Sequence, residues 1–153
     1  MNLRNKKGEE FHVDIVGYQF PDIHNKYWDS NWLNIRVSGI NSLGSWSVED
    51  PSLLTFEVES LASWLEKLIL DKVSQPREDF LEPNLKFCVI KHGFGSYLMR
   101  VDLCDVLLTD RVLEIFGDTR TVRLYFPLET VDLSHQAHLL REQLSNYPQR
   151  IFR

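Results

Sequence analysis

The chain has 153 residues and a mass of 18.0 kDa, and 43% of its residues are apolar, 12% aromatic and 25% charged. This length suits one domain with a sizeable hydrophobic core, and the composition excludes a disordered chain. No apolar run approaches the ~20 residues of a membrane span, and the first residues lack the apolar stretch of a signal peptide. We therefore expect a single domain over residues 1–153, located in the cytoplasm and without a membrane partner.

The net charge of -5 is distributed unevenly along the chain. Residues 49–82 hold nine acidic and three basic residues, and residues 102–118 hold five acidic residues and Arg111. Acidic surfaces repel phosphate backbones, so we expect no nucleic-acid partner, and they steer basic proteins toward the chain. A solvated face that only aids solubility is the plainer interpretation of the same blocks.

The cysteines and histidines do not form a metal-binding pattern. Cys88 and Cys104 are too few for a disulfide framework or a four-ligand zinc site, and we expect both to be free thiols. His135 and His138 lie three residues apart on a predicted helix, but no third ligand is spaced near them. We therefore expect no metal ion and no cofactor.

Half-buried strands are indicated in the first half by the alternation of apolar and polar residues. Strands are predicted over 11–15, 32–39 and 45–49. A loop rich in Pro, Asp, Asn and Ser is predicted over 20–31, and a hairpin turn over 41–44.

In the middle of the chain the spacing of apolar residues changes from every second residue to a period of about 3.6 residues, which predicts a helix. Asp50–Pro51 is expected to end the third strand, and a fourth strand is predicted over 54–58. The helix is expected to begin at Ser60 as its N-cap and to be followed by a polar connection over 71–83. Its apolar stripe consists of Leu61, Trp64, Leu65, Leu68 and Ile69.

The second half contains further strand patterns and one more helix. Strands are predicted over 85–91 and 97–103, joined by a turn with two glycines, and over 122–126. Residues 105–119 fit either an extension of the preceding strand or a short helix ended by Gly117. The apolar stripe of a last helix, which stops near Pro148, consists of Leu133, Ala137, Leu140, Leu144 and Tyr147.

These elements predict an α+β fold, with a mainly antiparallel β-sheet of about seven strands and two amphipathic helices packed on it. The same elements also allow two packed sheets with flanking helices. Each half runs from several strands to one helix, and the connections between strands are of hairpin length, which favours antiparallel pairing.

No catalytic motif is present in the sequence. The chain lacks a dinucleotide-binding glycine motif, a P-loop, a nucleophile elbow and a zinc-protease motif. Pairs of carboxylates such as Glu57 and Glu59 alternate with Phe56 and Val58. We therefore expect them on the solvent-exposed face of a strand and not as the catalytic acid and base of a glycosidase. We therefore predict no catalytic residue and no enzymatic activity.

Two tryptophans close together suggest an alternative function, the binding of a small ligand. Trp28 and Trp32 flank a polar segment that contains Asp29, and such rings could stack a sugar or a nucleotide. Nucleic-acid grooves combine aromatic rings with Lys or Arg, and no such residue lies between Tyr27 and Trp32. Core or half-buried packing is the favoured interpretation, and Trp28, Asp29 and Trp32 are the residues of the alternative ligand site.

Several segments occur in a particular order along the chain. They are VGYQFP (16–21), YWDSNWLNI (27–35), GSW (44–46), DPSLLTFEVESLASWLEKL (50–68), EPNLKF (82–87) and LREQLSNYPQR (140–150). Together they resemble the WapI family of bacterial immunity proteins. The resemblance implies a cytoplasmic protein that binds a cognate toxin domain delivered by neighbouring cells and neutralises it without turnover. The founding toxin of the family cuts RNA.

Partner binding is predicted for acidic residues of two segments, one just before the strand over 85–91 and one within about 92–120, where no motif lies. A shared motif holds the shared fold, whereas partner discrimination needs segments that are free to differ. An RNA-cutting toxin has a basic cleft, which an acidic surface complements. The predicted partner-binding residues are Glu78, Asp79, Glu82, Asp105, Asp110, Glu114 and Asp118.

Overall fold

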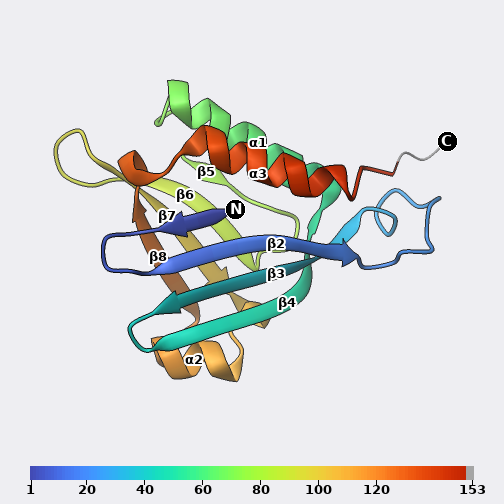
Figure 1. Cartoon of the computed structure of the whole chain (residues 1–153), viewed down its shortest axis with the longest axis horizontal. Coiled ribbons are helices and arrows are strands. Elements are labelled where there is room, and N and C mark those ends of the chain that lie inside the picture. Colours follow the sequence, from blue (N-terminus) through green and yellow to red (C-terminus); the bar gives the residue numbers. More distant parts are fainter. Residues whose placement is uncertain (151–153) are drawn as a thin grey trace.

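The computed structural model describes residues 1–150, which contain two four-stranded antiparallel sheets and three α-helices (Figure 1). Sheet A consists of β1 (Asn2–Arg4), β2 (Glu10–Tyr18), β3 (Trp32–Asn41) and β4 (Gly44–Leu54), paired in that order. Apolar residues alternate along β2 and β3 and point inward, so the first two predicted strands, the loop between them and the hairpin turn before β4 are confirmed.

The prediction that Asp50–Pro51 ends the third strand is wrong, because β4 continues through this pair to Leu54. Proline has no N–H group for a ladder, but β4 is the edge strand of sheet A, where one row of backbone groups needs no strand partner. The register against β3 shifts between Leu33 and Ile35, which indicates a β-bulge beside this segment.

Sheet B consists of β5 (Arg77–Glu78), β6 (Leu85–Lys91), β7 (Tyr97–Cys104) and β8 (Thr121–Pro127), again paired in chain order. The predicted hairpin of β6 and β7 and the predicted last strand are confirmed. The α+β class is confirmed as well, and the described residues form the two-sheet version of it. The strands β1 and β5 were not predicted, since segments of three and two residues are too short to show a period of two.

One continuous core fills the space between the sheets and under the helices. Phe87 on β6 is at its centre, with its ring centroid 6.3 Å from that of Phe11 on β2 and 6.5 Å from that of Trp64. Phe80 also packs against Phe87, and Trp46 on β4 packs against Phe11. All five side chains are at most 9% exposed, and we call them the buried aromatic chain.

The helix α1 (Thr55–Leu70) has Leu54 as its N-cap, six residues before the predicted N-cap. The expected fourth strand is therefore wrong, and so is the assignment of Ser60 as the N-cap. Val58 has the right spacing to join the helix stripe and is 1% exposed, so three alternating residues were an ambiguous signal. The predicted stripe is buried except for Ile69, which is 48% exposed.

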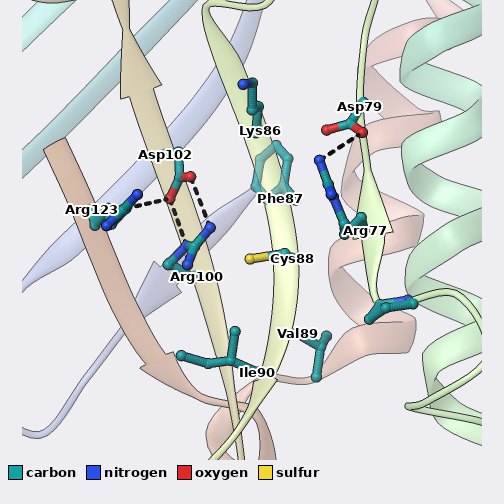
Figure 2. A pocket seen from close by; sticks show the side chains of 11 residues that line it. Arg77, Asp79, Lys86, Phe87, Cys88, Val89, Ile90, Arg100, Asp102 and Arg123 are labelled. Carbon is teal, nitrogen blue, oxygen red and sulfur yellow. Dashed lines mark hydrogen bonds and ion pairs between the residues drawn. The ribbon is translucent and has the colours of Figure 1, made fainter. Parts of the chain in front are cut away.

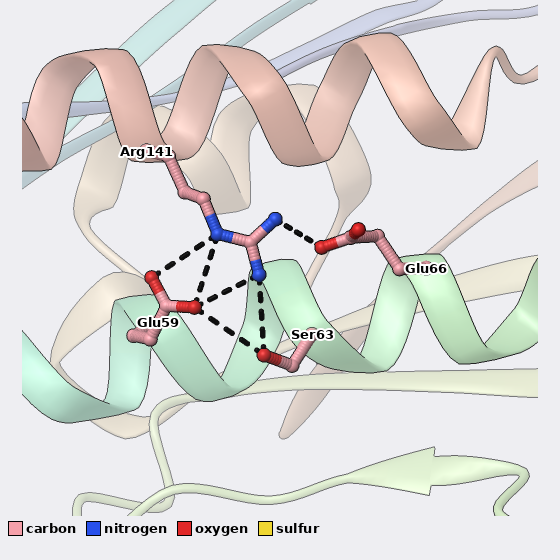
Figure 3. Close-up of polar contacts among 4 residues, drawn as sticks. All are labelled: Glu59, Ser63, Glu66 and Arg141. Atoms are coloured by element: carbon pink, nitrogen blue, oxygen red, sulfur yellow. Dashed lines mark hydrogen bonds and ion pairs between the residues drawn. The ribbon is translucent and has the colours of Figure 1, made fainter.

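The helix α3 (Leu133–Ser145) lies beside α1, and the two helices cover one side of the molecule (Figure 1). Figure 3 shows the polar contacts that join them, in which the guanidinium of Arg141 on α3 forms a two-pronged ion pair with Glu59 and a further one with Glu66. The prediction that Glu59 lies on the solvent-exposed face of a strand is thus wrong, because this residue lies on α1. No helix within residues 1–150 is both long and apolar enough to cross a membrane.

A short helix resolves the two alternatives for residues 105–119. After the 3-10 helix η1 (Asp105–Leu107), α2 (Asp110–Phe116) is capped by the Thr109 side chain and ends at Gly117. Gly117 has a φ of 85°, a conformation that favours glycine. Figure 1 shows α2 on the far side of the sheets from α1 and α3. A second 3-10 helix, η2 (Leu128–Thr130), leads from β8 toward α3.

Candidate functional site

A fully buried asparagine fixes the loop between β2 and β3 against the start of α1. The Asn31 side-chain amide donates to the carbonyl oxygens of Tyr27 (2.8 Å) and Arg150 (3.0 Å). Its carbonyl oxygen accepts from the Thr55 hydroxyl (2.9 Å) and from the backbone N–H of Arg150 (2.8 Å). Every hydrogen-bonding group of the amide is used, which gives a physical reason for Asn at this position of the YWDSNWLNI segment.

Two aromatic rings of this loop are exposed to solvent and pack on the half-buried ring of Phe56 on α1. Tyr27 and Trp28 are 51% and 50% exposed, and both rings pack against Phe56 in the first turn of α1. The ring centroids of Tyr27 and Phe56 are 5.6 Å apart with an interplanar angle of 27°, and those of Trp28 and Phe56 are 6.0 Å apart. We call Tyr27, Trp28 and Phe56 the exposed aromatic cluster.

The residues of the alternative ligand site do not share one environment. Trp28 belongs to the exposed aromatic cluster and is not a core residue. Asp29 is half-buried and forms an ion pair with Lys26, with 3.7 Å between the charged atoms. Trp32 is half-buried on β3, where it pairs with Leu54 of β4. The Trp28 ring is therefore the most exposed of these three side chains.

Acidic side chains converge beside the first turn of α1. Glu57 accepts hydrogen bonds from the backbone N–H groups of Leu54 (2.9 Å) and Leu81 (2.6 Å). Burial raises the pKa of Glu57 above its ordinary value; the two backbone hydrogen bonds oppose this shift, and the charges of Glu78 and Glu82 add to it. We call Glu57, Glu78 and Glu82 the α1 acidic group.

Two of the predicted partner-binding residues belong to this group, and a third lies next to it in the chain. Glu78 accepts a hydrogen bond of 2.6 Å from the hydroxyl of Ser60, so it is held against the exposed side of α1. Asp79 is paired with Arg77 at 3.4 Å, which offsets its charge.

The other four predicted residues surround η1 and α2, and we call them the α2 acidic group: Asp105, Asp110, Glu114 and Asp118. All four are exposed, and Glu114 is paired with Arg111 at 3.1 Å. The same arginine donates to the backbone carbonyl oxygen of Ser45 (3.1 Å), which attaches α2 to the beginning of β4.

The structure thus divides the predicted residues between the two ends of one strand. Ser45, at the start of β4, contacts the α2 region, and Leu54, at its end, contacts Glu57. An extended segment of this length spans roughly 30 Å, which is about the width of a standard interface of ~800 Å² per partner. A standard interface centred on one acidic group, which extends about half that width in each direction, therefore does not include the other.

Basic residues gather on the outer face of sheet B, an arrangement that the sequence reasoning missed. They surround a groove of about 400 Å³ whose basic side chains are Arg77, Lys86, Arg100 and Arg123 (Figure 2). Strand register explains their convergence, because Lys86, Asp102 and Arg123 are cross-strand neighbours on one face. Asp102 accepts from Arg100 at 2.8 Å and lies 3.9 Å from Arg123. In the sequence these bases are spread over four strands, so no local pattern signals that they share one face.

The groove does not have the features of a reactive site. Cys88 lies on its floor, and burial raises the pKa of its thiol, which disfavours the nucleophilic thiolate. Cys88 and Cys104 are both free, as predicted. Within residues 1–150, no group of three or more His, Cys, Asp or Glu side chains is arranged to hold a metal ion.

Comparison with known protein families identifies a match over nearly the whole chain. Residues 2–148 match the model of the immunity protein WapI-like family, a range that includes 92–120, where no motif had been identified. No curated protein matches the chain.

Proposed function

Because the chain belongs to the immunity protein WapI-like family, we propose that it binds a cognate toxin domain in the cytoplasm and neutralises it by stoichiometric contact, without catalysis. The observation that carries this proposal is the extent of the family match, which covers both sheets and all three helices. A match of that extent concerns the whole described fold rather than one local motif.

Charge complementarity supports a basic toxin, such as one that cuts RNA. Such an enzyme needs a cationic cleft for its substrate, and acidic surfaces increase the rate at which a cationic partner associates. The α1 acidic group and the α2 acidic group are the surfaces of this chain with that character. Within residues 1–150, Glu78, Glu82, Asp105, Asp110 and Asp118 form no ion pair that would offset their charge.

Co-expression with the toxin is the direct test of this function. The probe is the C-terminal toxin domain of a large secreted protein encoded immediately beside this gene. We expect the two chains to purify together at a fixed ratio, and cells that make the toxin domain to survive only when this chain is present. Lack of such a neighbouring gene, or failure of the two chains to purify together, would contradict the proposal.

Charge reversal then tests which acidic surface takes part. The double substitutions Glu78→Lys with Glu82→Lys and Asp110→Lys with Glu114→Lys each replace two acidic residues by two basic ones. We expect slower association and weaker protection, with both effects shrinking at high salt because exposed charges are screened. Association rates that stay unchanged in both variants would exclude a role for the acidic groups.

The alternative function is binding of a sugar or nucleotide at Trp28. The half-exposed Trp28 ring is the observation that favours it, since a flat ring can stack such a ligand. Thermal-shift assays against sugars and nucleotides test it, and stabilisation that disappears in Trp28→Ala would support it over toxin binding.

A further inference from the structure

We infer that the exposed aromatic cluster is the energetic centre of the toxin-binding surface, and that it binds an arginine or lysine side chain of a basic partner. This inference rests on the proposed function and adds a location and a chemistry to it. The α1 acidic group would flank this centre, and the α2 acidic group would lie outside the contact and attract the approaching partner by its charge.

The first argument is that these rings are exposed although the fold offers buried positions for aromatics. Tyr27 and Trp28 each leave about half of their surface in water, with fractions of 51% and 50%. Their contacts are with each other, at 5.0 Å between centroids, and with Phe56. Adjacent exposed aromatic residues mark interaction sites, and Trp and Tyr are the residues most enriched among those that dominate binding energy.

The second argument is that the cluster is rigid before any partner binds. Asn31 holds the carbonyl of Tyr27 through a hydrogen bond of 2.8 Å and is itself fixed to Thr55 at the start of α1. The N–H of Asn31 donates to the carbonyl of Trp28 at 2.9 Å. Side chains that are already ordered lose little conformational entropy on binding, so more of their contact energy appears as affinity.

The third argument concerns the charge beside the rings, which identifies the partner chemistry. Phe56 and Ser60 lie one turn apart on the same face of α1, and Ser60 donates to Glu78. Glu57 directly follows Phe56 and is close enough to Glu78 and Glu82 for their charges to raise its pKa. A cation that stacks on an aromatic face beside carboxylates gains both cation–π and ion-pair interactions, whereas a phosphate is repelled.

The basic groove limits how such a partner can approach. The groove on the outer face of sheet B is lined by four basic and two acidic side chains, so it repels a cationic protein. The α2 acidic group attracts the same partner but carries no exposed aromatic cluster of its own. Attraction without an apolar centre accelerates encounter more than it slows dissociation. We therefore assign the centre of the contact to the α1 end and long-range attraction to the α2 end.

Binding kinetics of Trp28→Ala test the inference, with the catalytically inactivated toxin domain as the probe. We expect a dissociation constant about 30-fold higher, mainly through faster dissociation and with little salt dependence. Trp28→Phe, which keeps a ring, should lose less. Glu78→Lys with Glu82→Lys should instead slow association in a salt-dependent way.

A matched control uses an exposed aromatic residue far from the cluster. Phe94 is fully exposed in the turn between β6 and β7, which Figure 1 shows at the opposite end of the molecule from the loop between β2 and β3. Phe94→Ala should bind the toxin domain as the wild type does. Circular dichroism and thermal unfolding of each variant establish that the fold is intact.

The outcomes separate this inference from the proposed function. Wild-type binding with less than a threefold effect of folded Trp28→Ala would overturn the inference while leaving toxin binding in place. A larger loss in Asp110→Lys with Glu114→Lys than in Trp28→Ala would overturn it as well, by moving the centre to α2. No binding by the wild-type chain would overturn the proposed function and the inference with it.

Discussion

Two sets of aromatic residues in this protein have opposite environments. The buried aromatic chain joins both sheets to α1, and each of its members is at most 9% exposed. The exposed aromatic cluster is attached to the same helix by Phe56, yet Tyr27 and Trp28 are half in solvent. Both sets include residues of one stretch of sequence, 27–65, which contains all four tryptophans.

One stretch of sequence thus supplies both the scaffold and a surface. Trp46 and Trp64 are needed because they fill the core, where large apolar side chains contribute several kcal/mol each. Trp28 fills no core space and adds little to folding. A sequence signature therefore identifies the fold without telling which of its residues face a partner, and burial separates the two roles.

The largest expected effect compares two tryptophans, one from each set. Trp64 is 2% exposed, and its indole N–H donates to the carbonyl of Gln75 at 2.7 Å. Trp64→Ala should lower the free energy of unfolding by about 3–5 kcal/mol because it leaves a cavity. Trp28→Ala should lower it by less than about 1 kcal/mol. Urea unfolding of both variants measures the difference. Equal losses would contradict the assignment of Trp64 to the core and of Trp28 to the surface.

The next effect concerns Asn31, which connects the exposed aromatic cluster to the scaffold. In Asn31→Asp the carboxylate can still accept from Thr55 and Arg150, but it no longer donates to the carbonyls of Tyr27 and Arg150. We expect a loss of about 3 kcal/mol or more at pH 7, because a buried charge then faces two carbonyl oxygens.

The pH dependence of Asn31→Asp identifies the cause of that loss. Burial and the two carbonyls should raise the pKa of the new carboxyl in the folded state. The variant should therefore regain stability as the pH falls and lose it as the pH rises through that pKa. Asn34→Asp, at a half-buried position on β3, is the control and should show neither effect. A pH-independent loss in Asn31→Asp would point to cavity or shape effects instead.

A smaller effect tests how tightly the buried aromatic chain meets sheet A. A Cβ atom at Gly39 would lie 2.6 Å from the Trp46 ring and 2.7 Å from the carbonyl oxygen of Glu10. Gly39→Ala should thus cost about 1–3 kcal/mol through overpacking. Gly17→Ala is the matched control on β2, where no atom lies within 4 Å of the new Cβ, and its stability should be unchanged or slightly higher. Thermal unfolding measures both variants, and equal unfolding temperatures would contradict the close contact between Gly39 and the Trp46 ring.

Much of the fold could be predicted from sequence because its strands and helices have regular apolar periods. Val58 shows where this fails, since three alternating residues satisfy a strand and a helix equally and only burial against α3 and the sheets decides between them. Pro51 shows a second limit, because a proline is compatible with a strand only at a sheet edge, and edge positions are set by topology.

The candidate site could be predicted in part. The acidic character of two segments is readable from sequence, but only the fold places Glu57 with Glu78 and Glu82, since these residues lie on α1, β5 and the following loop. Exposure of Trp28 could not be predicted, because this residue lies in a loop, and a loop has no apolar period that separates buried from exposed side chains. The basic groove required the register of four strands, which no local pattern contains.

The smallest expected effect concerns the charge beside the exposed aromatic cluster. The raised pKa of Glu57 means that the folded state favours its neutral form relative to the unfolded state. This contribution to stability is fully present below the unfolded pKa and is lost as the pH rises through the folded pKa. Glu82→Gln removes one repelling charge, so it should lower the pKa of Glu57 and weaken that loss, as measured by NMR titration of the side-chain carboxyl carbon.

Glu129→Gln is the control for this titration, because the charges that act on Glu57 are those of Glu78 and Glu82, so a change on η2 should leave the Glu57 titration unchanged. A bound basic partner should act in the same direction as Glu82→Gln, since a nearby cation favours the ionised carboxylate. The pKa of Glu57 would then report directly whether the toxin domain occupies the α1 end. A complex in which this pKa stays raised would instead place the partner elsewhere on the molecule, and the exposed aromatic cluster would need another explanation.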